Sequence, residues 1–227
     1  MAERRGYGDP CGIARGLDVV GTRWALLVVR ELLLGPKRFG DLRAGLPGMS
    51  AETLGQRLRQ LEEEGVVRRT TLPPPASVPV YELTDWGHEL RPVVLALGRW
   101  GSHAPFPPGD ASLSPDSMML ALATMFDPAR ARDVEATYGV RLGEHAFRVR
   151  VVGGELDLAR GGAGDTDAVI ATDTATLPEL LWRDLPVEEA EKAGALEIEG
   201  SRRAARRFLG LFRPSPQPAR TRWSAPR

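Results

Sequence analysis

Residues 22–83 read TRWALLVVRELLLGPKRFGDLRAGLPGMSAETLGQRLRQLEEEGVVRRTTLPPPASVPVYEL, and the signals in this stretch follow the order helix, short helix, amphipathic helix and two-stranded hairpin. Ser50 suits the N-cap of the amphipathic helix, because its hydroxyl can accept a hydrogen bond from a free backbone N–H of the first turn. Gly65 can take the left-handed conformation that closes the other end. The buried stripe of this helix should consist of the leucines at three- and four-residue steps, Leu54, Leu58 and Leu61.

The hairpin completes the pattern. Strands are expected over 66–71 and 78–83, and the loop between them is stiff and rich in proline, as suits a wing. This order of elements is that of a winged helix-turn-helix, in which one helix lies in the major groove of DNA. A polar helix face alone is more often a solvated surface, so this interpretation depends on the whole order of parts.

The face of the amphipathic helix opposite the leucines carries donors and acceptors of the kinds that read base edges, with arginine suited to guanine and glutamine to adenine. Base contacts are expected from Ser50, Thr53, Gln56, Arg57 and Gln60. Basic residues that precede this helix or follow it at the root of the wing should contact phosphates. These residues are Lys37, Arg38, Arg43, Arg68 and Arg69.

Residues 11–101 resemble the HxlR family of bacterial winged-helix regulators. The resemblance is carried by Trp24, Gly35 with Arg38-Phe39, Leu46-Pro47-Gly48-Met49-Ser50, Leu61-Glu62, Gly65, Tyr81-Glu82-Leu83-Thr84, Gly87 and Trp100. It implies that double-stranded DNA is a partner. It also implies a homodimer, because in this family the last helix pairs with its twin and with the N-terminal helix.

A last helix is expected from Thr84-Asp85 to about His103, although Pro92 implies a kink or a helix that effectively begins near Leu90. Its apolar face consists of Leu90, Val93, Val94, Leu97 and Trp100. This stripe suits a dimer contact, and two subunits could read two half-sites one helical turn apart. The alternative is that the stripe packs only within its own domain.

Cys11 lies just before this bundle and is the only cysteine, so the chain can form no intrachain disulfide. Some members of the resembled family use an N-terminal cysteine as a thiol sensor. The alternative is an unreactive small apolar residue, and exposure and thiolate character would decide between the two. Residues 1–10, which precede it, suit a mobile arm.

The composition fits a soluble protein of two domains, with 227 residues of which 42% are hydrophobic and 26% charged. The formal net charge is zero, which excludes a uniformly basic protein but not a local basic patch. The most apolar stretch, 24–34, is interrupted by Arg30 and Glu31, so neither export nor membrane spanning is indicated. We therefore expect a cytoplasmic protein with no membrane partner.

A proline-rich linker is expected over 104–114, followed by a second domain over 115–213 and a disordered basic tail over 214–227. The pattern of the second domain predicts a helix over 116–126 and a hairpin that turns at Gly153-Gly154. The remaining elements should be strands over 134–142, 146–152, 168–172 and 195–199 and helices over 174–183, 187–193 and 201–212.

This second domain resembles the sterol carrier protein fold, an α/β domain that encloses an apolar ligand tunnel. The resemblance is carried by residues 167–173, by Leu177-Pro178-Glu179-Leu180-Leu181-Trp182, by residues 195–201 and by Phe208-Leu209 with Phe212. It implies an apolar small-molecule effector. The candidate pocket residues are Met118, Leu122, Phe126, Phe147, Trp182, Phe208 and Phe212, for which the alternative is ordinary core packing.

No catalytic set stands out in the sequence. His88, His103 and His145 are far apart and lack partners at metal-ligand spacing, so no metal and no cofactor are expected. The glycine run at 161–164 lacks the lysine that completes a phosphate-binding loop. We therefore expect a non-enzymatic, sequence-specific DNA-binding transcriptional regulator that is modulated by an apolar ligand. The alternatives are a lipid carrier whose pocket does not regulate DNA binding and an enzyme that acts on the bound molecule.

Overall fold

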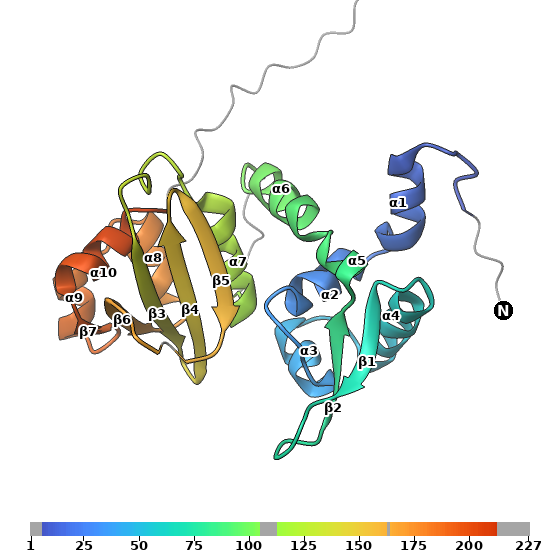
Figure 1. Ribbon diagram of the computed structural model, residues 1–227, viewed down its shortest axis with the longest axis horizontal. Helices are drawn as coiled ribbons and strands as arrows, with labels where there is room; N and C mark the ends of the chain where they lie inside the picture. The colour runs from blue at the N-terminus through green and yellow to red at the C-terminus, as the bar shows by residue number, and fades with distance from the viewer. Residues whose placement is uncertain (1–5, 105–112, 163, 213–227) are drawn as a thin grey trace, which may run out of the picture.

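The computed structural model describes residues 6–104, 113–162 and 164–212 (Figure 1). Most of the expected linker, the expected tail and half of the expected arm lie outside these residues. The first half of the chain contains α1 (Gly12–Val20), α2 (Ala25–Leu32), α3 (Phe39–Gly45), α4 (Ala51–Glu63), β1 (Val67–Thr71), β2 (Pro79–Leu83), α5 (Asp85–His88) and α6 (Arg91–Gly101).

The predicted winged helix-turn-helix is confirmed in the first half. Ser50 caps α4, and its hydroxyl accepts from the backbone N–H of Thr53 at 3.1 Å. Gly65 follows the helix with a φ of 74°. β1 and β2 pair antiparallel from Val67 opposite Leu83 outward to the wing. The expected leucine stripe of α4 is fully buried and packs in the core with α2.

Two helix boundaries are set by single residues. α2 begins at Ala25, because Trp24 adopts a left-handed conformation with a φ of 77° and cannot belong to the helix. The expected last helix is divided into α5 and α6. Thr84 caps α5, and Pro92 lies in the first turn of α6, where no N–H is needed, so the helix effectively begins near Leu90 as its sequence indicates.

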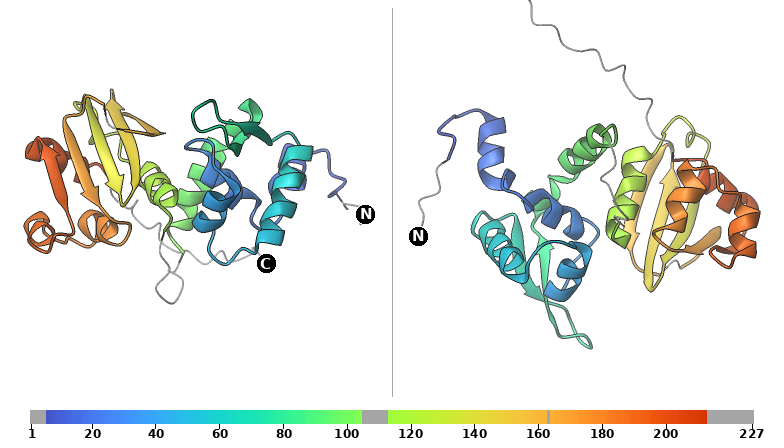
Figure 2. Two further views of the ribbon diagram at one scale, coloured as in Figure 1. Left: turned by 90° about the horizontal axis from the view of Figure 1, so that it is seen from below. Right: turned by 180° about the vertical axis from the view of Figure 1, so that it is seen from behind.

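The second half forms a five-stranded sheet in the order β5-β4-β3-β6-β7, with β3 and β6 parallel and the other pairs antiparallel. One face of the sheet is covered by helices, and the opposite face is uncovered (Figures 1 and 2). β4 shows the difference, because Phe147, Val149 and Val151 are buried whereas Arg148 and Arg150 are exposed. The elements are α7 (Pro115–Met125), β3 (Ala136–Leu142), β4 (His145–Val152), β5 (Glu155–Arg160), β6 (Ala168–Thr172), α8 (Thr176–Trp182), α9 (Val187–Lys192), β7 (Glu197–Gly200) and α10 (Arg202–Leu209).

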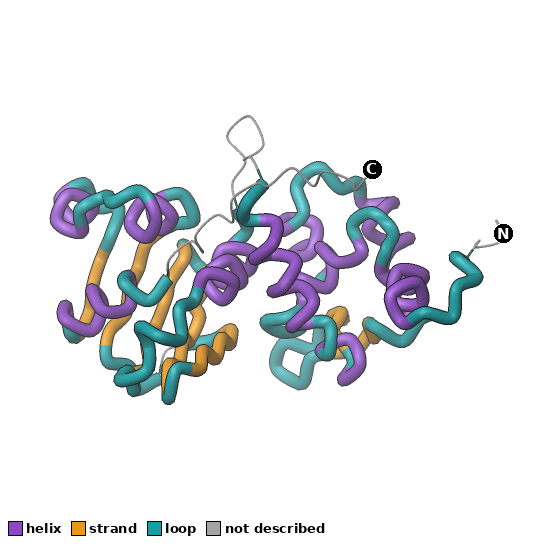
Figure 3. Tube along the Cα trace, turned by 90° about the horizontal axis from the view of Figure 1, so that it is seen from above, coloured by secondary structure: helices purple, strands orange, loops and turns teal. Residues whose placement is uncertain are grey.

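The two halves meet through helices. The strands of the wing and those of the five-stranded sheet lie apart with helices between them (Figure 3). α7 of the second half packs against α2 and α6 of the first. At the crossing of α6 and α7, a Cβ on Gly98 would lie 2.7 Å from Cγ2 of Thr124, so only glycine allows this close approach. Within the described residues, no helix is both long and apolar enough to cross a membrane.

Candidate functional site

The exposed face of α4 is the side of the first half that is shaped to enter a groove. Its exposed side chains follow helical spacing along Glu52, Gln56, Arg59 and Glu63. The leucines on the opposite side hold the helix against the core. Arg59 was not among the expected base-reading residues. Its position three residues after Gln56 places both side chains on one face, and this spacing was the signal in the sequence that could have identified it.

The five expected base-reading residues do not share one surface. Gln56 and Ser50 are exposed, whereas Thr53, Arg57 and Gln60 are partly buried. The hydroxyl of Ser50 is engaged in capping α4. Nη1 of Arg57 donates to Oγ1 of Thr22 at 2.5 Å and also to Oε1 of Gln60. The arginine therefore ties α4 to the segment before α2, and base contacts by Arg57 and Gln60 stay a prediction.

Four of the five expected phosphate-binding residues are exposed: Arg38, Arg43, Arg68 and Arg69. Arg68 is 64% exposed and its Nε lies 2.7 Å from Oε1 of Glu82 on the neighbouring strand of the wing. Such an exposed ion pair contributes little to stability. These side chains remain candidates for phosphate contacts.

The expectation that Lys37 contacts phosphate is wrong in this structure. Its Nζ lies 2.6 Å from Oε2 of Glu31 and 2.8 Å from Oδ2 of Asp116, and the residue is only 5% exposed. Its backbone joins the wing instead, because the N–H groups of Lys37 and Tyr81 donate to each other's carbonyls at 2.9 and 2.8 Å. Lys37 therefore links β2 to a residue of the second half.

We call the polar residues around Lys37 the junction cluster, which consists of Arg30, Glu31, Lys37, Ser114, Asp116, Ser117 and Arg160. Oε1 of Glu31 accepts from Ser114 at 2.9 Å, from Ser117 at 3.1 Å and from Nη2 of Arg30 at 2.9 Å. Asp116 accepts from Nε of Arg160 at 3.0 Å and also from its Nη2. Glu31 and Asp116 are 0% and 1% exposed, so they are buried charges with full sets of partners.

The junction cluster leaves no room for a side chain at Gly45. A Cβ on Gly45, the last residue of α3, would lie 2.3 Å from Oε2 of Glu31. Because the hydrogen bonds of Glu31 fix its carboxylate, the side chain cannot simply move aside. α3 therefore packs directly against the buried carboxylate through a glycine.

Most of the expected pocket residues belong to the core of the second half, which corrects the prediction that they line a ligand site. Met118, Leu122, Phe147, Phe208 and Phe212 are at most 1% exposed. The rings of Phe208 and Phe212 lie 4.9 Å apart, and those of Phe126 and Phe212 lie 6.1 Å apart. These side chains fill the space beside the sheet by packing on each other, as aromatic core residues do.

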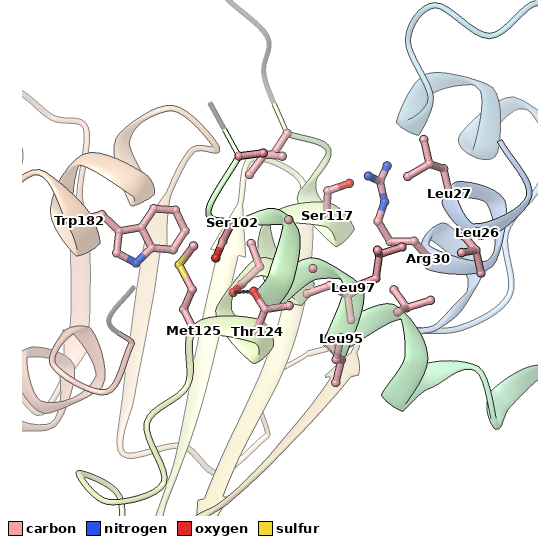
Figure 4. A pocket seen from close by; sticks show the side chains of 17 residues that line it. Leu26, Leu27, Arg30, Leu95, Leu97, Ser102, Ser117, Thr124, Met125 and Trp182 are labelled. Atoms are coloured by element: carbon pink, nitrogen blue, oxygen red, sulfur yellow. Dashed lines mark hydrogen bonds between the residues drawn. The ribbon is translucent and has the colours of Figure 1, made fainter. Parts of the chain in front are cut away.

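Of the candidate residues, Trp182 borders a cavity, and this cavity lies between the two halves (Figure 4). We call it the junction cavity; its volume is about 390 Å³. Figure 4 shows Trp182 on one side of the cavity and Arg30 toward the other side with Leu26 and Leu27 of α2, and residues of α6 and α7 lie between Trp182 and Arg30. The lining residues are Leu26, Leu27, Arg30, Val94, Leu95, Leu97, Gly98, Gly101, Ser102, Ala104, Leu113, Ser117, Leu120, Ala121, Thr124, Met125 and Trp182.

Two helices of the first half expose apolar side chains away from the core. Ile13 on α1 is 76% exposed, and Trp100 on α6 is 75% exposed. Leu17 on α1 and Val93 and Leu97 on α6 are also exposed. Val93, Leu97 and Trp100 follow helical spacing along one face of α6, and an exposed apolar face of this kind is a candidate interaction surface.

Cys11 precedes α1 and is an exposed free thiol. Among the described residues, no group of histidine, cysteine and carboxylate side chains could hold a metal ion. The pKa of Tyr138 is raised by burial, against a lowering by Arg207, and its hydroxyl has no hydrogen-bond partner in the described part of the chain. This hydroxyl lies in the core rather than in the junction cavity.

Comparison with known proteins gives one match for each half. Residues 19–105 match the HxlR-like helix-turn-helix family, and residues 110–218 match the alkyl sulfatase C-terminal family. The HTH-type transcriptional regulator sll1512 of Synechocystis sp. is 41% identical over 42% of this chain and 70% of its own length. YvaP of Bacillus subtilis, also an HTH-type transcriptional regulator, is 38% identical over 39% of this chain and 82% of its own length. A structure of the sec-alkylsulfatase Pisa1 from Pseudomonas sp. is 21% identical over 44% of this chain and 16% of its own, with a TM-score of 0.42.

Proposed function

Because the chain belongs to the HxlR-like helix-turn-helix family, we propose that it is a homodimeric, sequence-specific DNA-binding transcriptional regulator whose affinity for DNA responds to an apolar small molecule. Its relatives are HTH-type transcriptional regulators, which supports binding to double-stranded DNA. A cytoplasmic location follows from this proposal, because such a regulator acts on the chromosome.

The observation that carries the proposal is the exposed polar face of α4 beside a basic wing root. Gln56 and Arg59 stand on the exposed face and suit adenine and guanine edges. Arg68 and Arg69 leave β1 as exposed cations, which suits contacts with phosphates. α4 would lie in the major groove and the wing would follow the backbone beside it.

The apolar faces of α1 and α6 support the dimer. A second copy would cover Ile13, Val93 and Trp100, which are 76%, 50% and 75% exposed within the described part of the chain. Two copies would present two α4 helices to successive half-sites, and this arrangement multiplies specificity. In the same proposal, the exposed Cys11 is a thiol sensor that joins subunits on oxidation.

We assign the second half a ligand-binding role, with a fold like that of sterol carrier proteins. An α/β layer with one covered sheet face and a domain boundary at the linker of 104–114 is compatible with that assignment. The match to the C-terminal family of alkyl sulfatases supports contact with an apolar molecule. We propose binding rather than catalysis, with a lipid carrier that does not regulate DNA as the alternative.

The test is binding of the full-length protein to labelled DNA from upstream of its own gene, measured by fluorescence anisotropy across a salt series. A specific site should bind at least about a thousandfold more tightly than scrambled DNA. The affinity should fall steeply with salt, as it does for proteins that displace counterions from phosphates. Size-exclusion chromatography with light scattering should give twice the mass of one chain.

The alternatives predict different results in the same experiment. Equal binding to specific and scrambled DNA would overturn the regulator and favour a carrier. If binding is specific but a cellular lipid extract leaves it unchanged, then the proposed control by a ligand is wrong and the DNA-binding regulator stands. Hydrolysis of an added alkyl sulfate by the purified protein would show that the second half is an enzyme.

A further inference from the structure

We infer that the junction cavity is the effector site and that it takes an amphiphile with one apolar chain and one anionic head group. This inference deepens the proposed ligand response and rests on it. It moves the ligand from the core of the second half, which aromatic side chains fill, to the space between α2, α6 and α7. Because aromatic side chains fill that core, a ligand would bind instead in the junction cavity, which Trp182 borders.

The volume and lining of the junction cavity indicate the apolar part of the ligand. Its volume of about 390 Å³ falls in the range of small-molecule pockets, which begins at roughly 300 Å³. Leu26, Leu95 and Leu120 contribute to the wall from three different helices. A wall of this kind binds a hydrocarbon chain by removing it from water, without directional contacts.

The charges of the junction cluster fix the head group. On the side away from the cavity, the positive charges of Lys37 and Arg160 balance those of Glu31 and Asp116. Arg30 is the third cation, so the cluster carries one more positive than negative charge. Arg30 lines the junction cavity, and only its Nε and Nη2 donate to Glu31.

An anion at the Arg30 end of the cavity would therefore neutralise the extra positive charge of the junction cluster. Nη1 of Arg30 has no partner among the described residues, and it could donate to a carboxylate or sulfate without breaking the bond to Glu31. Ser117 borders the same end, but its hydroxyl donates to Glu31, so Arg30 is the donor for the head group (Figure 4). Carboxylate and sulfate share this chemistry, so the structure assigns the charge and the test separates the two head groups.

The position of the ligand explains how it could act on DNA binding. The cavity wall includes Val94 and Leu97 of α6, and Leu97 also belongs to the exposed apolar side chains of this helix that are proposed to pair with a second copy. The same cavity touches α2, against which α4 packs. A ligand that binds one arrangement of α2, α6 and α7 more tightly than another would shift the protein toward that arrangement.

The experiment is calorimetric titration of the full-length protein with decanoate, decyl sulfate, decanol and decyltrimethylammonium, each below its micelle concentration. Both anions should bind about ten- to a hundredfold more tightly than decanol, because each gains a charge-assisted hydrogen bond. The cation should bind most weakly. From hexyl to decyl chains, the affinity should rise about fourfold for each methylene group until the cavity is full.

Three variants locate the ligand. Arg30→Gln should lower the affinity for both anions to that for decanol and leave decanol unchanged. Ala121→Phe fills the junction cavity and should abolish binding of every compound, whereas Ala129→Phe places the same side chain on the exposed turn after α7 and should have no effect. Trp182→Phe should remove the fluorescence change that accompanies binding.

Other outcomes would overturn the inference. If decanol and decanoate bind equally well and Arg30→Gln changes neither affinity, then the site does not require an anionic head group. Undiminished binding to Ala121→Phe would place the ligand elsewhere. If Ala121→Phe changes the mass of the particle in solution but not ligand binding, then a second copy occupies the cavity. Because these titrations contain no DNA, failure of the proposed DNA recognition would leave their outcome unaffected.

Discussion

The exposed face of α4 and the junction cluster are both polar, but the first is available for recognition and the second joins the two halves of the molecule. On α4, Gln56 and Arg59 face solvent and contribute little to the folded state. In the junction cluster, Glu31 and Asp116 are buried and each of their oxygens is satisfied by a partner. Polar side chains on a surface are available for recognition, whereas buried ones hold two parts of the molecule in a fixed relation.

The largest expected effect that tests this comparison is that of Lys37→Met. Removing the ammonium leaves Glu31 and Asp116 buried without their shared partner, which should lower the free energy of unfolding by about 3–5 kcal/mol. Urea denaturation measures it. Lys192→Met on the exposed α9 is the matched control and should change stability by less than about 0.5 kcal/mol. If the Lys37→Met variant is as stable as the parent but binds DNA more weakly, then Lys37 contacts DNA rather than the buried carboxylates.

Gly45→Ala should have the next largest effect. The new Cβ would lie 2.3 Å from Oε2 of Glu31, and relief requires that buried hydrogen bonds be rearranged. Overpacking of this kind costs about 1–3 kcal/mol in thermal or urea denaturation. Gly40→Ala on the same helix is the control, because a Cβ there meets nothing within 4 Å and should be neutral or slightly stabilising. Equal stability of the two variants would mean that Glu31 is not fixed in place.

Arg59→Ala tests the other side of the comparison. It should weaken binding to the specific DNA site by about 1–3 kcal/mol and relax the preference at one base pair, because a guanine contact is lost. Its stability should stay within about 0.5 kcal/mol of the parent. Arg57→Ala is the informative partner, since loss of its bonds to Thr22 and Gln60 should also reduce stability. If Arg59→Ala leaves DNA binding unchanged, then the exposed face of α4 does not read bases.

Tyr138→Phe should have the smallest effect, and its sign depends on pH. Near pH 7 the variant should be as stable as the parent or more stable by about 1 kcal/mol, because an unpaired buried hydroxyl is removed. Burial raises the pKa of Tyr138, so the parent loses stability as the pH rises above the value of about 10 for a tyrosine in the unfolded chain. The advantage of the variant should therefore grow in alkaline urea denaturation. A constant difference between the variants at all pH values would contradict this.

The secondary structure followed from local patterns in the sequence. The Ser50 cap, the leucine spacing of α4 and the break near Pro92 all depend on residues within a few positions of each other, and the structure agrees with each. Strand β6 has the expected bounds, because a short apolar run flanked by polar residues has few alternatives. The left-handed conformation of Trp24 was not predicted, because such a conformation is rare for tryptophan and the sequence gives no sign of it.

The junction could not be predicted because its contacts join distant parts of the chain. Lys37 and Asp116 are 79 residues apart, and each taken alone resembles an ordinary surface charge. For the same reason, Arg57 was expected to face DNA although its partner Thr22 lies 35 residues earlier. The aromatic residues of the second half were correctly identified as apolar, but only the packing shows that they fill the core.

Lys37 connects the wing to the second half of the molecule. Its backbone is hydrogen-bonded to Tyr81 in strand β2 of the wing, while its side chain forms an ion pair with Asp116 at the start of α7. A displacement of α7 would therefore reach the wing directly through Lys37, in addition to the path through the packing of α7 against α2 and α6. Lys37 therefore couples the position of the second half to that of the wing.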